Sequence, residues 1–227
     1  MIWRSIITLF SKDISIELRT RETLSVQATM SLILGVICSI GAHSAMLSPS
    51  EILTVFPILI WFTFLFSSAL AVAKGFEYEK DNDAITGIIL TGVDPSLIYL
   101  SKVTATLFTT ILGHILALIV FSLLLNIGIL PYIVPFLAVS ILCAIGYCSI
   151  SCLLTPVALS SRLRGAMLPL ISLPLMFPIL FSAVETTIEI FIDHTFSWSS
   201  VWVSILLIFD VIYLTAGINL FEKVVKE

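Results

Sequence analysis

The chain has 227 residues, of which 59% are hydrophobic and only 11% charged, with a mean hydropathy of +1.14. A soluble domain of this length would carry roughly a quarter charged residues, so the composition excludes one and indicates a polytopic membrane protein. The net charge of −4 gives no reason to expect a nucleic-acid partner. The partner expected from composition is the lipid bilayer.

Residues 1–22 are predicted to form an amphipathic helix in the headgroup plane of the membrane. Scattered charges and the lack of a small-residue cleavage pattern argue against a cleavable signal peptide. The apolar stripe consists of Trp3, Ile6, Ile7, Phe10, Ile14 and Leu18, and the opposite face of Arg4, Lys12, Ser15 and Arg19.

Six apolar stretches follow, each close to the roughly 20 residues that cross the hydrocarbon core. They cover residues 24–45, 52–73, 103–125, 133–159, 167–184 and 202–221. Little of the chain remains for anything else. We therefore predict an all-α fold, with a single six-span transmembrane domain over residues 23–227.

All eleven Lys and Arg residues fall on one side of this arrangement. Four precede the first stretch, three lie between the second and third, two between the fourth and fifth, and two at the end. The opposite connections, 46–51, 126–132 and 185–200, contain no Lys or Arg, and the acids on this side lie in the first and third of them. By the positive-inside rule both termini are expected in the cytoplasm.

The segment 74–102 is the longest polar interruption. It opens with a charged cluster, has helical character over 84–90, breaks at Thr91-Gly92 and restarts at Asp94-Pro95, where Asp94 is expected to cap a new helix. A short cytoplasmic helix that docks into a partner and a solvated loop are both compatible with this pattern.

Two later segments are also polar or irregular. The fifth stretch contains Pro169, Pro174 and Pro178, which predict a kinked or broken helix, either along a path or at an architectural bend. After it, acids at four-residue steps over 185–200 predict a short amphipathic helix on the outer surface.

Two ionisable residues fall inside spans, His114 in the third and Asp210 in the sixth. Such residues tend to face the bundle interior or water. His114 is expected to be a neutral, hydrogen-bonded histidine, with a role in haem ligation or proton transfer as the alternative. Asp210 is expected to be protonated or bonded to a neighbouring helix. The four cysteines, Cys38, Cys143, Cys148 and Cys152, are expected to be small packing residues.

Several catalytic motifs are absent from the sequence. There is no G-x-x-x-x-G-K-[ST], so the chain is not expected to bind ATP by that loop, and no H-E-x-x-H or G-x-S-x-G. No metal site is predicted either. The sequence shows no set of residues typical of a hydrolase, and the chain is expected not to be an enzyme.

The interfacial helix, the six spans and the cytoplasmic segment between spans two and three resemble the membrane subunit of an ABC-2 type transporter. Two motifs resemble more closely the CcmB family, the haem exporter protein B of cytochrome c maturation. One is Phe76-Glu77-x-Glu79, followed by Ala84, Gly87, Ile88-Ile89-Leu90, Val93-Asp94 and Ile98-Tyr99-Leu100-x-Lys102. The other is Arg162-x-Arg164 with Leu168-Pro169, Leu173-Pro174 and Pro178.

The resemblance implies that segment 74–102 couples to a partner ATPase. The coupling residues would be Phe76, Glu77, Glu79, Asp83, Leu90, Asp94 and Lys102. It further implies two copies of a CcmA-like ATPase that binds ATP, CcmC-like and CcmD-like membrane partners, and the haem chaperone CcmE as an indirect partner. Haem would be the cargo of the pathway, and the location would be the bacterial inner membrane.

Two other functions remain open from sequence alone. One is an ABC-2 permease for another cargo, such as a lipid or small molecule. The other is a free-standing proton-coupled carrier or intramembrane enzyme built on His114 and Asp210, which would need no ATPase partner.

Overall fold

The computed structural model describes residues 2–81, 92–160 and 167–226, and within them the chain is helical with no strand. Six of the helices are long and apolar enough to cross a membrane. This confirms the predicted all-α, six-span architecture. The elements are α1 (Ile2–Thr20), α2 (Glu22–Ser44), α3 (Pro49–Asp81), α5 (Pro95–Leu125), the short 3₁₀ helix η1 (Leu130–Tyr132), α6 (Ile133–Ser160), α7 (Met167–Phe191) and α8 (Val201–Lys226).

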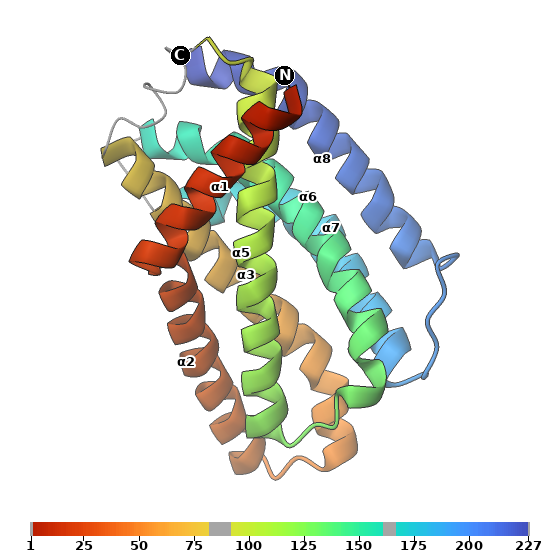
Figure 1. The fold of residues 1–227 in the computed structure, drawn as a ribbon. Helices are drawn as coiled ribbons and strands as arrows, with labels where there is room; N and C mark the ends of the chain where they lie inside the picture. Colours follow the sequence, from red (N-terminus) through yellow and green to blue (C-terminus); the bar gives the residue numbers. More distant parts are fainter. Residues whose placement is uncertain (1, 82–91, 161–166, 227) are drawn as a thin grey trace.

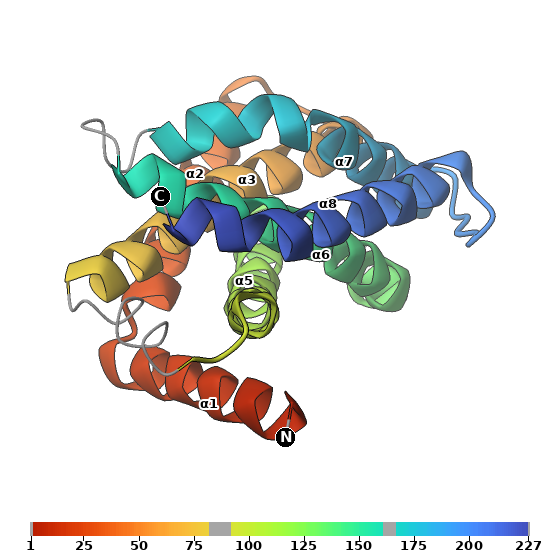
Figure 2. The ribbon, with the colours of Figure 1, turned by 90° about the horizontal axis from the view of Figure 1, so that it is seen from above.

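The six long helices form a bundle with α6 at its centre, packed against α3, α5, α7 and α8. Helix α2 lies on one side against α3 and α5. Helix α1 lies outside the bundle and packs mainly against α5 (Figures 1 and 2). Both termini lie at the same end of the bundle, where α3 ends and α5 begins (Figure 1).

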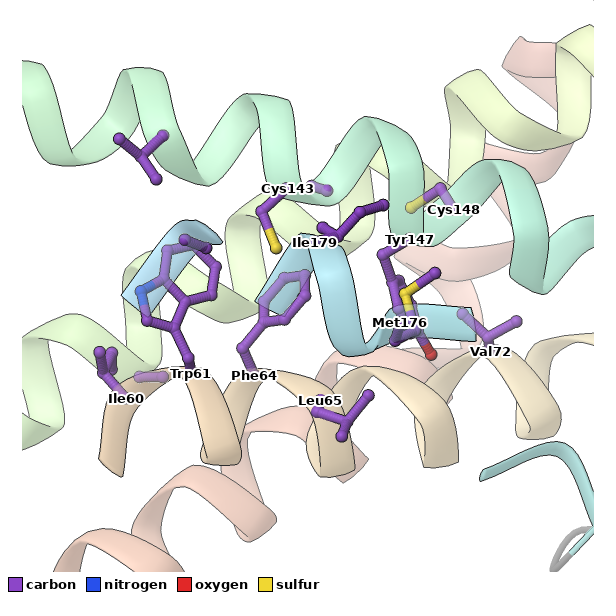
Figure 3. Packing of buried hydrophobic residues seen from close by; sticks show 14 of the residues in the cluster. Ile60, Trp61, Phe64, Leu65, Val72, Cys143, Tyr147, Cys148, Met176 and Ile179 are labelled. Atoms are coloured by element: carbon purple, nitrogen blue, oxygen red, sulfur yellow. The ribbon is translucent and has the colours of Figure 1, made fainter. Parts of the chain in front are cut away.

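The core is built from large side chains of α3, α5, α6 and α7. The ring of Phe64 on α3 meets that of Tyr147 on α6 edge-on, with ring centres 5.5 Å apart, and Trp61 packs against Phe64. Met176 and Ile179 of α7 lie between α3 and α6 (Figure 3). The indole Nε1 of Trp61 donates to the hydroxyl of Thr187, 2.8 Å away. The core is therefore held by apolar packing together with a hydrogen bond between α3 and α7.

The cysteines behave as the packing residues predicted for them. All four are free, and three of them, in α6, are fully buried. The thiols of Cys148 and Cys152 lie 3.7 Å and 3.6 Å from the hydroxyls of Thr110 and Thr106 on α5. They fill the α5–α6 contact.

Glycines bring the helices close together. A Cβ atom at Gly146 of α6 would collide with the Asp210 carboxylate, and one at Gly217 of α8 would collide with the Tyr99 ring. Small residues at such positions let helix backbones approach within a membrane, where dispersion contacts drive association. The sequence leaves these spaces for specific side chains of neighbouring helices.

The helices differ from the predicted elements at two ends. Helix α3 continues through the charged cluster to Asp81 instead of ending at residue 73. Helix α7 continues to Phe191, so the separate outer helix expected over 185–200 is wrong for its first half. After residue 73 the helix-forming Glu77, Glu79 and Lys80 extend α3, and Gly75 does not interrupt it. After residue 184 Glu185 and Glu189 extend the last turns of α7. The helix expected over 84–90 lies outside the described residues.

Helix α7 is also not broken, although Pro174 and Pro178 lie inside it. A proline in a helix disturbs the carbonyls three and four residues before it. The carbonyl of Leu175, three residues before Pro178, accepts a hydrogen bond from the Tyr213 hydroxyl of α8 at 2.5 Å. A neighbouring helix therefore supplies a partner beside the proline.

We expect Gly217→Ala to lower the stability of the detergent-solubilised protein by about 1–3 kcal/mol, because the added methyl group meets the buried Tyr99 ring. Gly41→Ala is the matched control, since no atom lies within 4 Å of its added methyl group. Thermal unfolding of both variants is the measurement, and equal midpoints would contradict this packing.

Candidate functional site

The start of α5 carries the residues that the sequence singled out after the break at 91–92. Asp94 is the N-cap: its Oδ1 accepts hydrogen bonds from the Ser96 hydroxyl at 2.6 Å and the Ser96 amide at 2.9 Å, and Pro95 occupies the first turn. These two bonds, the hydroxyl first, hold the pKa of Asp94 below its ordinary value. The predicted helix start is confirmed.

Tyr99, one turn further, joins the first two turns of α5 to two other helices. These turns, residues 95–102, are called the foot of α5 below. Its side chain is fully buried, and its hydroxyl donates to the backbone carbonyl of Ser149 on α6 at 2.9 Å. Its ring lies against Gly217 and 5.4 Å from the Phe221 ring, both on α8. The sequence motif that contains Tyr99 is thus a junction of α5, α6 and α8.

Lys102, the last residue of that motif, ties the same turn of α5 to α1 and α3. Its Nζ lies 3.0 Å from the Oδ2 of Asp13 on α1, and the two side chains are only 9% and 11% exposed. The same ammonium lies 5.9 Å from the centre of the Phe76 ring on α3, a cation–π distance. Phe76 itself is buried.

A cavity of about 90 Å³ lies beside this ion pair, between α1, α2, α3 and α5. Its wall includes Asp13, Glu17, Gln27, Phe76 and Lys102. Most of its lining is apolar, and a space of this size has room for only a few water molecules beside the polar side chains. The charged groups at the foot of α5 therefore sit beside a pocket that separates much of α1 from α3.

The other predicted coupling residues are only partly covered by the structure. Glu77 and Glu79 lie in the last turns of α3, but their side chains are outside the described part. Asp83 and Leu90 lie outside the described residues altogether. The structure brings Phe76 and Lys102 together and places Asp94 two turns before Lys102 on α5. The roles of all seven stay predictions.

Sequence reasoning missed Asp13. The helical pattern of residues 1–22 was assigned an apolar stripe and a cationic face, and Asp13 belongs to neither. The signal that could have pointed to Asp13 is its position as an acid between the apolar and cationic faces of the interfacial helix. Its partner was not visible because the pairing joins residues far apart in the chain.

His114 lies in an aromatic box formed by rings of α3 and α6. The ring centres of Trp61, Phe64 and Phe136 are 5.0, 4.9 and 5.6 Å from that of His114, which is 4% exposed. Neither ring nitrogen has a hydrogen-bond partner among the described residues. The hydrogen bond expected for His114 is therefore wrong within that part of the chain, and aromatic packing takes its place.

Asp210 lies in a different environment, on α8 against the backbone of Gly146 and the side chain of Ile179. It is 5% exposed, so it faces the bundle interior as predicted. The structure places it against α6 and α7, whereas His114 lies among aromatic rings of α3 and α6. Across the described ranges, no group of three His, Cys, Asp or Glu side chains could hold a metal ion.

The fold and this junction define a multi-pass membrane protein of the permease type. A family model described as CcmB protein matches residues 4–221, nearly the whole chain. The chain belongs to the CcmB family and is a membrane subunit of the haem exporter of cytochrome c maturation. No curated protein matches it.

We expect His114→Phe to leave the level of haem-bearing c-type cytochromes within about twofold of wild type, because it keeps an aromatic ring and removes two buried nitrogens. His114→Ala is the packing control and should destabilise the protein by about 3 kcal/mol through the space it leaves. Haem staining of membranes, normalised to the amount of this chain, is the measurement. A loss of cytochromes in His114→Phe at normal protein level would show that the imidazole has a chemical role.

Proposed function

We propose that this chain couples ATP hydrolysis by a partner ATPase to the release of the haem-loaded chaperone CcmE from a CcmC-like protein. Two copies of a CcmA-like ATPase would bind the ATP, and a CcmD-like protein would complete the assembly. The chain itself would be non-catalytic, with no bound cofactor, and haem would be the cargo of the pathway.

The observation that carries this proposal is that the foot of α5 contacts four other helices. Tyr99 joins this turn to α6 and α8, and Lys102 joins it to α1 and α3. A displacement of the segment that enters α5 would therefore reach most of the bundle. A surface loop without such contacts would absorb the displacement instead.

The arrangement of charge supports the proposed orientation. The termini lie at the end of the bundle where α3 ends and α5 begins (Figure 1), and Lys12, Lys74 and Lys102 belong to the helices α1, α3 and α5 that meet there. By the positive-inside rule this end would face the cytoplasm, where ATP is available. The membrane would be the bacterial inner membrane.

The carrier or enzyme hypothesis finds less support in the structure. It depends on His114 and Asp210, which lie in separate environments, and the His114 ring is enclosed by aromatic side chains. Proton transfer between two groups needs hydrogen-bond reach, directly or through water. We therefore favour the coupling function.

Charge reversal of the acids that precede α5 tests this function. We expect a Glu77→Lys, Glu79→Lys and Asp83→Lys triple variant to insert normally but to lower the ATPase rate of the purified complex at least tenfold, because the acids would no longer match the ATPase surface. The control is Asp193→Lys, an exposed acid in the connection between α7 and α8. It should leave the ATPase rate unchanged. An unaltered rate in the triple variant would count against coupling through this segment.

A further inference from the structure

We propose that Asp13 is a positioning residue that makes α1 move together with the foot of α5. This inference rests on the proposed coupling function and adds a residue and a helix to it. Helix α1 would then be a working part of the coupling device as well as a membrane-surface anchor.

The Asp13 carboxylate bridges two ammonium groups. Its Oδ1 lies 2.9 Å from the Nζ of Lys12, and its Oδ2 lies 3.0 Å from the Nζ of Lys102. The Lys102 side chain is 9% exposed and that of Asp13 11%. An ammonium so far removed from water needs a nearby negative charge, and removing that charge is costly. The Asp13–Lys102 pair is thus a strong constraint on the position of α1.

Helix α1 takes its position from α5 more than from the rest of the bundle. The Phe10 ring meets the Phe108 ring of α5 edge-on, with ring centres 6.4 Å apart. On the side of α3, the cavity of about 90 Å³ lies between the helices. The outer flank of α1 exposes Ile7 and Leu18, which are 61% and 65% accessible, and this flank suits contact with lipid. Helix α1 can therefore follow α5 without losing a packed interface with α3.

A second acid of α1, Glu17, has a different partner. Its Oε1 accepts a hydrogen bond from the amide of Leu24 at 2.9 Å and so fastens α1 to the first turn of α2. Asp13 and Glu17 lie one helical turn apart and line the same cavity. They form a matched pair, because Asp13 forms an ion pair with Lys102 of α5 and Glu17 bonds to α2.

The test measures how much cytochrome is formed for each ATP hydrolysed by the same amount of complex. A loss of folded protein does not change this ratio. In the purified complex and in membranes, we compare Asp13→Asn, Asp13→Glu and Glu17→Gln for the ATPase rate and for haem-bearing c-type cytochromes, both normalised to the amount of complex. For Asp13→Asn we expect ATP hydrolysis within about threefold of wild type and at least a tenfold fall in cytochrome formed per ATP hydrolysed. Asp13→Glu keeps the carboxylate and should retain coupling, as should Glu17→Gln.

A cross-link keeps the proposal testable if Asp13→Asn does not fold. In a background with the four native cysteines replaced by alanine, Asp13→Cys and Lys102→Cys are combined and bridged with a short, reducible thiol cross-linker. We expect the bridged complex to form several times more cytochrome per ATP hydrolysed than the same complex after reduction, because only the bridged form links α1 to α5.

Three results would overturn the inference. They are normal coupling in Asp13→Asn, equal losses in Asp13→Asn and Glu17→Gln, and no gain of coupling on bridging. Absence of ATPase activity from the wild-type complex would instead contradict the proposed function, so the two failures can be told apart.

Discussion

The hydrocarbon core offers no water to buried polar groups, and the arrangement of this bundle depends on that constraint. Several of its buried polar side chains bond to groups on neighbouring helices. Trp61 donates to Thr187, Tyr99 to the carbonyl of Ser149, and Tyr213 to the carbonyl of Leu175 beside a proline. Each bond links two helices and so fixes their relative position. Glycines such as Gly217 then make room for the side chains that reach across.

Polar contacts between helices are especially informative at the end of the bundle that holds the termini. Within two turns of its start, α5 is capped by Asp94, buried against α6 and α8 through Tyr99, and paired with α1 through Lys102. Because the first turns of α5 are held by these contacts, a displacement of the preceding segment moves α5 and its neighbours and does not unwind the helix end. The same contacts that stabilise the membrane domain therefore suit it for coupling to a partner outside the membrane.

Much of the fold could be predicted because the bilayer imposes simple local rules. Length and hydropathy gave the six spans, and the Asp94-Pro95 pair marked the start of α5. Charge is a poorer guide to helix ends: the charged cluster that begins at Lys74 predicts a helix end at residue 73, but Lys and Glu favour helices and α3 continues to Asp81. The Asp13–Lys102 pair and the aromatic box around His114 depend on which helices become neighbours. Periodicity within one segment does not contain that information.

The central claim is that this chain works as the membrane partner of an ATPase. Its most direct test is purification from the native membrane in detergent, with mass spectrometry of the bound proteins and an ATPase assay of the product. The account predicts recovery of an ABC ATPase, together with CcmC-like and CcmD-like proteins, and measurable ATP hydrolysis. A chain that purifies alone and without ATPase activity would contradict it.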